Sequence, residues 1–260
     1  MSYKPFDLTG KVCLITGGNG GIGLGMAEAL AQAGSDVVIW GSNADKNAVA
    51  EAQLKAHGTR ILVQQVDVGD EAQVVAAMAE AEAKMGRLDS VCANAGVGRG
   101  APSFHEMTTE IWRANMRVNL DGAFWTLREA CKSMVKRAKA GDPGGSVSAT
   151  ASLGALQGAA RNQAYTATKG ALIPMLKGIA VEYGRYGIRA NAILPGWVAT
   201  DMTASAQGYD KFNEAVIGRV PSKRWGRPDE FGGIAVYLAS DASSFHTGDV
   251  ILIDGGYSCF

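Results

Sequence analysis

The chain has 260 residues, of which 47% are hydrophobic, and this composition suits one large α/β domain. Lysine plus arginine and aspartate plus glutamate each total 25, so the net charge is zero and no long-range field attracts nucleic acid. The apolar runs are much shorter than the roughly 18 residues of a transmembrane helix, so we expect no membrane span.

The first residues contain no apolar signal segment, and we therefore expect a cytoplasmic protein. Four cysteines are present, and none belongs to a C-x-x-C pair: Cys13, Cys92, Cys131 and Cys259. This pattern predicts reduced structural thiols. It argues against a disulfide framework and against a zinc site, so no metal is expected.

Residues 11–17 form a short apolar run that ends in glycine, which predicts a strand buried on both faces. A glycine-rich turn, a helical pattern up to Gly34 and a second apolar run at 37–40 follow, as in a dinucleotide-binding βαβ unit. The same alternation continues along the chain. The further predicted strands are 61–66, 88–93, 145–150, 188–194 and 249–253, and the further predicted helices are 44–57, 70–85, 108–137, 162–184 and 228–240. This order predicts a Rossmann-type doubly wound parallel sheet of about seven strands, with helices on both faces.

No composition shift or long linker marks a second domain, so residues 1–260 are expected to form a single domain. One segment, 196–227, breaks the alternation, because it predicts two short helical fragments where a crossover needs one helix. A long insertion after the carboxyl end of a strand is usually functional or mobile. We interpret this segment as a lid over the substrate.

The glycine-rich turn reads T-G-G-N-G-G-I-G from Thr16 to Gly23. Side chains at Gly17, Gly21 and Gly23 would obstruct a pyrophosphate, which the positive end of the following helix would attract. Glycine-rich turns also close ordinary strand–helix connections. The strand before this turn and the βαβ pattern around it favour dinucleotide binding.

Tyr165 and Lys169 stand four apart in a helical pattern, so both side chains project from one face. A free tyrosine, with a pKa near ~10, holds its proton too tightly to act as a base at neutral pH. An ammonium one turn away favours the phenolate, and Ser152, at the end of a predicted strand, can hydrogen-bond a substrate oxygen. Taken alone, this pattern also fits a pair on a helix surface.

Further candidate residues fall at predicted strand ends, where open α/β sheets bind ligands. For Asp67 the structural alternative is a turn or a helix cap, and for residues 94–96 it is an ordinary turn. Asn119 is a further candidate that does not lie at a strand end. It lies inside a long predicted helix, and asparagine is a poor helix former. The candidates at strand ends are Asp67, Val68, Asn94, Ala95, Gly96, Pro195, Gly196 and Thr200.

Together these motifs resemble the short-chain dehydrogenase/reductase family in its compact, single-domain form, over nearly the whole chain. The matching motifs are T-G-x-x-x-G-I-G at 16–23, D-V at 67–68, N-A-G at 94–96, Asn119, Ser152, Y-x-x-x-K at 165–169 and P-G-x-x-x-T at 195–200.

The resemblance implies an NAD(P)(H)-dependent oxidoreductase that transfers a hydride between the nicotinamide and a secondary alcohol or ketone. It makes Tyr165 the acid/base, Lys169 the group that lowers its pKa, and Ser152 the group that polarises the substrate oxygen. Asn119 then supports a water-linked proton relay. The resemblance also implies a homo-oligomer, a dimer or tetramer, that associates through helices 108–137 and 162–184. The predicted cofactor-binding residues are Gly17, Asn19, Gly21, Ile22, Gly23, Ser42, Asn43, Asp67, Val68, Asn94, Ala95, Gly96, Tyr165, Lys169, Pro195, Gly196, Val198 and Thr200.

The sequence leaves the choice between NAD and NADP open. Gly41 stands where NAD users carry the acidic residue that binds the ribose, and Ser42 stands where many NADP users carry a basic one. Ser42, Asn43 and Lys46 offer hydrogen bonds and one charge to a 2′-phosphate, which favours NADP.

Three alternatives remain beside the dehydrogenase. A catalytically silent nucleotide sensor or scaffold predicts loss of Ser152, Tyr165 or Lys169, and all three are present. A sugar-nucleotide epimerase needs a longer carboxyl-terminal domain, and an enoyl reductase spaces its tyrosine and lysine farther apart. The substrate is a small alcohol or carbonyl compound: a polyol, sugar acid, hydroxyacyl thioester or cyclic alcohol. The predicted substrate contacts are Leu153, Gly154, Gln157, Arg161, Gln163, Trp197 and Met202.

Overall fold

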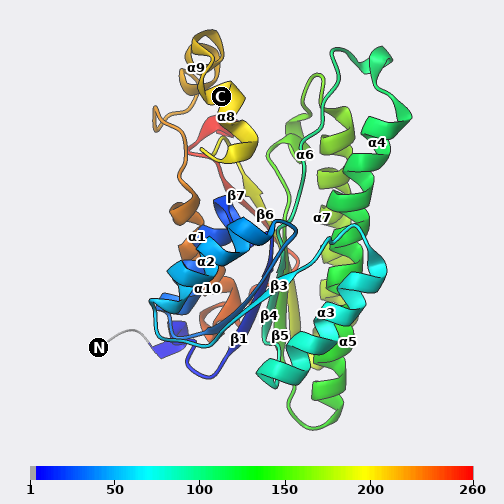
Figure 1. Ribbon diagram of the computed structural model, residues 1–260, viewed down its shortest axis with the longest axis vertical. Helices are drawn as coiled ribbons and strands as arrows, with labels where there is room; N and C mark the ends of the chain where they lie inside the picture. Colours follow the sequence, from blue (N-terminus) through cyan, green and yellow to red (C-terminus); the bar gives the residue numbers. More distant parts are fainter. Residues whose placement is uncertain (1–3, 260) are drawn as a thin grey trace.

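The computed structural model describes residues 4–259, and its centre is one parallel sheet of seven strands in the order β3-β2-β1-β4-β5-β6-β7 (Figure 1). All neighbouring strands pair in parallel, so the predicted Rossmann-type fold is confirmed. The strands are β1 Val12–Thr16, β2 Asp36–Gly41, β3 Ile61–Gln65, β4 Ser90–Ala93, β5 Gly145–Thr150, β6 Ile188–Pro195 and β7 Val250–Ile253. The strand order reverses between β1 and β4, and open sheets bind ligands at such a switch point.

Helices cover both faces of this sheet, and Figure 1 shows α1, α2 and α10 on one side and α3, α5 and α7 on the other. Each side has its own apolar core, since the central strands are buried on both faces. The long helices are α1 Gly21–Gln32, α2 Ala44–Lys55, α3 Glu71–Met85, α4 Thr109–Asn115, α5 Gly122–Lys139, α7 Gln163–Tyr183 and α10 Gly232–Ala239.

The predicted helix 108–137 is helical from Thr109 onward, after the N-cap Thr108, but it is not one regular α-helix. Between α4 and α5 the segment η3, Met116–Asp121, is π-helical and contains Asn119. A π-bulge widens a helix by one residue per turn and is frequent at functional sites. It therefore explains how an asparagine sits in the middle of a helix with its side chain directed at another element.

The segment 196–227 contains the short helices η5 Asp201–Thr203 and α8 Ala204–Gln207, followed by α9 Asp210–Ile217. An aromatic cluster attaches this segment to the rest of the protein. The Trp197 ring centroid lies 5.0 Å from that of Phe212, 6.0 Å from that of Trp225 and 6.5 Å from that of Tyr257. Edge-to-face contacts of this kind each add about 0.5–1.5 kcal/mol beyond the buried area.

Within residues 4–259, no helix is both long and apolar enough to cross a membrane. The same part of the chain has no group of His, Cys, Asp and Glu side chains arranged to hold a metal ion. Cys13, Cys92 and Cys131 are buried free thiols, and Cys259 is an exposed one.

Candidate active site

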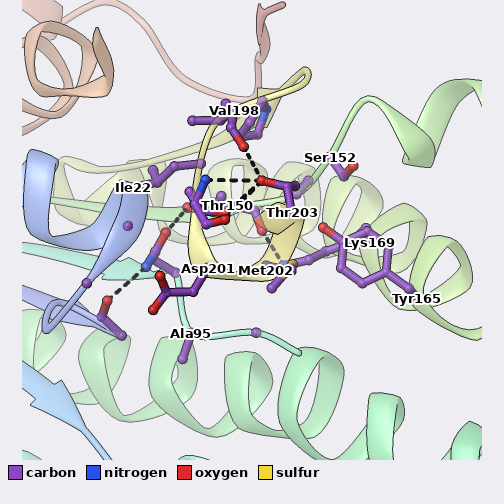
Figure 2. A pocket seen from close by; sticks show the side chains of 18 of the residues that line it. Ile22, Ala95, Thr150, Ser152, Tyr165, Lys169, Val198, Asp201, Met202 and Thr203 are labelled. Atoms are coloured by element: carbon purple, nitrogen blue, oxygen red, sulfur yellow. Dashed lines mark hydrogen bonds between the residues drawn. The ribbon is translucent and has the colours of Figure 1, made fainter. Parts of the chain in front are cut away.

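A cavity of about 320 Å³ opens at the carboxyl ends of β1, β4, β5 and β6 (Figure 2). The glycine turn forms one end of this cavity, and the first turns of α7 form the other. Residues from the start of segment 196–227 complete the wall. Of the predicted site residues, the cavity brings together Gly17, Asn19, Gly21, Ile22, Asn94, Ala95, Gly96, Ser152, Tyr165, Lys169, Pro195, Gly196, Val198 and Thr200.

The glycine turn is shaped by backbone conformations and by lack of space. Gly17 and Gly21 have φ of +66° and +51°, a region that residues with a side chain seldom adopt. A Cβ at Gly23 would lie 2.3 Å from the Gly17 carbonyl oxygen, so this glycine allows α1 to begin directly beneath the turn. Because these glycines have no side chains, the backbone at the positive end of α1 is accessible, and this suits the binding of an anion such as a pyrophosphate.

Asn94 ties three strand ends together at the centre of the cavity floor. Its Nδ2 donates to the Thr16 carbonyl oxygen at 3.0 Å, and its Oδ1 accepts from the Thr150 hydroxyl at 2.9 Å. The Thr16 hydroxyl in turn accepts from the backbone N–H groups of Asn94 and Ala95, both at 2.9 Å. The ends of β1, β4 and β5 are therefore held in one register.

Ser152, Tyr165 and Lys169 meet on one side of the cavity (Figure 2). The Lys169 Nζ lies 5.7 Å from the centroid of the Tyr165 ring and donates to the Thr150 carbonyl oxygen at 2.6 Å. The Ser152 Oγ accepts from the Gly154 N–H at 3.1 Å, which holds the serine side chain at the start of the loop before α7.

The ionisation of this group differs in one respect from the sequence prediction. Burial raises the pKa of the Tyr165 phenol, and a hydrogen bond with Ser152 offsets part of that rise. Burial also lowers the pKa of the Lys169 ammonium to about 8. The Tyr165 pKa is therefore raised, where the sequence analysis expected it to be lowered, because burial penalises the phenolate and the Lys169 ammonium is directed at the Thr150 carbonyl oxygen.

Asn119 is buried at 1% exposure and does not line the cavity. Its Oδ1 accepts from the Val97 N–H at 2.8 Å, and its Nδ2 donates to the Val97 carbonyl oxygen at 2.9 Å and to the Thr168 hydroxyl at 3.3 Å. It thus joins the loop after β4 to α7. A Cβ at Gly96 would lie 3.3 Å from the Asn119 Oδ1 and 3.4 Å from the Lys169 Nζ, so these two side chains are close neighbours.

Comparison with known proteins agrees with this geometry. A family model described as enoyl-(acyl carrier protein) reductase matches residues 17–258. A 2-dehydro-3-deoxy-D-gluconate 5-dehydrogenase from Pseudoalteromonas atlantica is 37% identical over 98% of both chains. Among solved structures, gluconate 5-dehydrogenase from Burkholderia cenocepacia, in complex with NADP and tartrate, superposes with a TM-score of 0.92 at 36% identity and 98% coverage of both chains. A short-chain type dehydrogenase/reductase from Mycobacterium marinum gives 0.92 at 31% identity and 99% coverage of both.

The chain belongs to the short-chain dehydrogenase/reductase family. The resemblance inferred from its motifs is confirmed, and the match extends over nearly the whole chain.

Several predicted residues of this family member lie outside the cavity wall. Gly23 lies beneath the turn, and the Asn43 Oδ1 caps α2 by accepting from the Lys46 N–H at 2.9 Å. Asp67 forms an ion pair with Arg117 at 2.8 Å, while Val68 is buried and Ser42 is exposed after β2. Among the predicted substrate contacts, Met202 lines the cavity, whereas Leu153 and Trp197 pack in the cluster that anchors segment 196–227.

The sequence analysis missed several members of the cavity wall in this dehydrogenase/reductase fold. They carry no family motif of their own: Gly20, Thr150, Ala151, Asp201 and Thr203. Thr150 and Ala151 follow from the strand-end rule, because β5 ends immediately before Ser152. Asp201 and Thr203 lie in segment 196–227, for which two short helical fragments were predicted, and only the fold decides which of its side chains face the cavity.

The buried Lys169 predicts an unusual pH dependence of stability. Between pH 8 and 10.5 the folded protein has lost this proton and the unfolded chain still binds it, so the free energy of unfolding rises with pH in that window. Relative to Lys169→Met, the wild type should gain up to about 3 kcal/mol across it. Urea denaturation at several pH values measures the difference.

Exposed Lys177, on the same helix, provides the control, because Lys177→Met should follow the wild type. A difference between Lys169→Met and the wild type that stays constant from pH 8 to 10.5 would contradict the burial of a titrating ammonium.

Proposed function

We propose that this protein is a nicotinamide-dependent dehydrogenase/reductase that acts on a secondary alcohol or its ketone. One observation carries the proposal: Ser152, Tyr165 and Lys169 line the same cavity as the glycine turn. The family membership and the dehydrogenase relative over nearly the full chain support it. NADP or NAD is the cofactor of this proposal, and NADP is favoured because the Burkholderia relative is in complex with it.

The residues present fit such a cofactor. The glycine turn leaves backbone N–H groups and the positive end of α1 open to a pyrophosphate. Lys46 and Lys169 add two positive charges to the wall, and Asp201 is its one acidic member among the described residues. When bound, the nicotinamide supplies or accepts the hydride.

The side chains of the protein transfer the proton to or from the substrate oxygen and stabilise the charge that develops on it. Tyr165, whose raised pKa keeps its proton, is suited to donate that proton to a carbonyl oxygen during reduction. Oxidation of an alcohol needs the phenolate, which the Lys169 ammonium and the positive charge of an oxidised nicotinamide would stabilise. The Ser152 hydroxyl donates to the substrate oxygen where negative charge develops. Asn119 fixes the Val97 backbone and, in this proposal, supports proton exchange toward Lys169.

Two alternatives are weaker. A silent nucleotide-binding scaffold has no need to bury Lys169 at 3% exposure without a carboxylate partner among residues 4–259. The matching family model bears an enoyl reductase description, but Tyr165 and Lys169 stand one turn apart on α7 and the full-length relative is a dehydrogenase. Carbonyl chemistry is therefore the proposal.

Tyr165→Phe should remove the proton donor and leave the cavity intact. We expect kcat to fall at least about 100-fold, the usual contribution of a positioned acid/base, with the Kd for NADP nearly unchanged. Stopped-flow kinetics and fluorescence titration measure the two quantities.

Tyr186→Phe, at the far end of α7 in the segment Gly184–Tyr186, is the matched control and should keep wild-type activity. Near-normal turnover of Tyr165→Phe would refute the assignment of the acid/base.

For the substrate we propose a sugar acid or a related hydroxy acid. The Pseudoalteromonas relative is named for such a compound, and the Burkholderia relative is in complex with tartrate. Exposed Arg99 and Arg161 offer the complementary charge, and neither has an ion-pair partner among residues 4–259. Their loops are joined by a hydrogen bond from the Ala101 N–H to the Arg161 carbonyl oxygen at 2.9 Å.

Both arginines have a fixed backbone near the cavity. Buried Asn115 donates to the Arg99 carbonyl oxygen at 2.9 Å, and a Cβ at Gly98 would lie 3.5 Å from Met202 of the cavity wall. Arg161 has a φ of +66°, a strained conformation for a residue with a side chain, four positions before Tyr165.

Arg99→Met and Arg161→Met should each raise KM for a gluconate-type acid about 10-fold or more, since each removes a charge-assisted hydrogen bond. The KM for a neutral polyol should change little. Exposed Arg113→Met on α4 is the control. Equal increases in KM for the acid and for the polyol would contradict the proposal that these arginines bind a substrate carboxylate.

We also propose a homo-oligomer, a dimer or tetramer, that associates through α5 and α7, in the cytoplasm where free thiols stay reduced. Phe124 on α5 is 44% exposed and Val181 on α7 is 87% exposed.

Phe124→Asp and Val181→Asp should shift the mass toward the monomer in light scattering. Phe245 is fully exposed, and the control variant Phe245→Asp should leave the mass unchanged. A monomeric wild type would refute this association.

A further inference from the structure

The tip of β2, where a dinucleotide-binding fold is expected to hold the adenosine ribose, lacks the acidic residue that would bind that ribose. The space for such a side chain is filled. A Cβ at Gly41, at the end of β2, would lie 2.1 Å from the Asn19 Nδ2 and 2.2 Å from the Asn47 Oδ1. An aspartate at this position is therefore excluded unless both amides move.

The two amides hold each other in that space. The Asn19 Nδ2 donates to the Asn47 Oδ1 at 2.7 Å, and the Asn47 Nδ2 donates to the Gly41 carbonyl oxygen at 3.0 Å. Asn47 is 5% exposed, so packing on α2 fixes it. The amide pair beside the tip of β2 is consequently neutral and polar, and it does not itself repel a second phosphate.

Lys46 stands next to this amide pair and lines the cavity together with Asn19 and Gly20. The Asn43 cap fixes its backbone in the first turn of α2, a helix of 12 residues whose positive end adds to the lysine charge. Its Nζ lies 2.5 Å from the Oδ2 of Asp201, the first residue of η5.

This ion pair links α2 to segment 196–227, and both of its residues line the cavity. The Lys46 side chain is 53% exposed and that of Asp201 is 88% exposed, so water screens the pair and it is readily exchanged. Residue Asp201 does not hold η5 in place. Thr203 does so, because its hydroxyl donates to the Val198 carbonyl oxygen at 2.7 Å and accepts from the Thr200 N–H at 3.1 Å.

We propose that Lys46 is the residue that selects NADP over NAD, and that the 2′-phosphate takes Lys46 from Asp201. A phosphate monoester carries more charge than a carboxylate and offers three acceptor oxygens, so it is the stronger partner for an ammonium. Binding of NADP then opens the link between α2 and segment 196–227, whereas NAD leaves it closed. This inference rests on the proposed use of a nicotinamide dinucleotide.

The test uses binding alone, so it does not depend on turnover. The full-length protein is titrated calorimetrically with adenosine 2′,5′-bisphosphate and with adenosine 5′-monophosphate. Lys46→Met should weaken the bisphosphate about 10-fold or more, and the monophosphate less than about 2-fold, because only the 2′-phosphate loses a charged partner.

Asp201→Asn should tighten the bisphosphate by removing its competitor and leave the monophosphate unchanged. This gain should vanish in the Lys46→Met background, because Asp201 acts through Lys46. Lys55→Met, which breaks the exposed Lys55–Glu51 pair at the other end of α2, is the matched control and should bind both compounds as the wild type does.

Each remaining outcome overturns a defined statement. Equal losses for both compounds in Lys46→Met would place Lys46 at the 5′-phosphate and refute its selective role, and so would no loss at all. A wild type that binds neither compound would refute the cofactor site itself, and the proposed function with it.

Discussion

The hydrogen bonds around Asn94 are the interaction on which the site depends. One amide side chain links the last residues of β1 and β5 across β4, and the Thr16 hydroxyl accepts from two backbone N–H groups of the loop that follows. Each such group, left unpaired away from water, costs about 1–3 kcal/mol. The glycine turn lies on one side of this junction. On the other side the Thr150 carbonyl oxygen accepts a hydrogen bond from Lys169, so the glycine turn and the Tyr165–Lys169 pair share one support.

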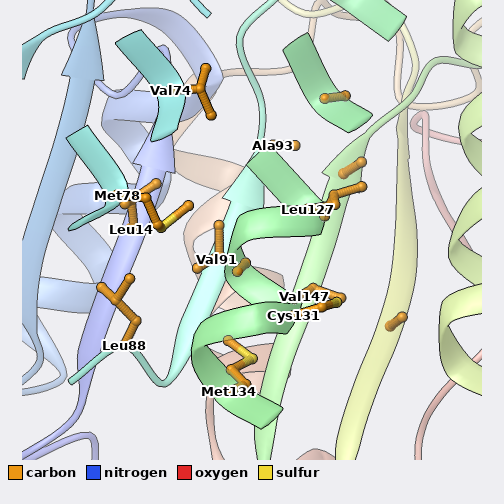
Figure 3. Packing of buried hydrophobic residues seen from close by; sticks show 14 of the residues in the cluster. Leu14, Val74, Met78, Leu88, Val91, Ala93, Leu127, Cys131, Met134 and Val147 are labelled. Atoms are coloured by element: carbon orange, nitrogen blue, oxygen red, sulfur yellow. The ribbon is translucent and has the colours of Figure 1, made fainter. Parts of the chain in front are cut away.

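The burial of Lys169 opposes the stability of the fold. The ammonium is 3% exposed, and among residues 4–259 its hydrogen-bond acceptor is a carbonyl oxygen and not a carboxylate. Its pKa is lowered because burial disfavours the charged form. The core on either side of the sheet offsets that cost. The apolar cluster between the sheet and α3 and α5, which includes Val91 and Val147, needs no polar group to complete it (Figure 3).

The elements of the fold were predictable from the chain because their signals are local. A buried run such as β1 and a capped helix such as α3, with Asp70 at its start and left-handed Gly86 at its end, are written in consecutive residues. The π-helical turn at Asn119 was not predictable. Its extra residue is stabilised by hydrogen bonds to Val97 and Thr168, which lie 22 and 49 positions away in the chain.

By itself, then, the sequence determined the α/β order, the glycine turn and the helical spacing of Tyr165 and Lys169, since each depends on neighbours a turn or less apart. Tertiary structure alone decided the electrostatics. Burial, not the nearby ammonium, governs the Tyr165 pKa. Only the fold shows that the side chains of Asn19 and Asn47 occupy the space that an acidic side chain at Gly41 would need. Only the fold brings Lys46 into contact with Asp201, which lies 155 positions away in the chain. Desolvation and long-range contacts are properties of packed surfaces, and no window of consecutive residues contains them.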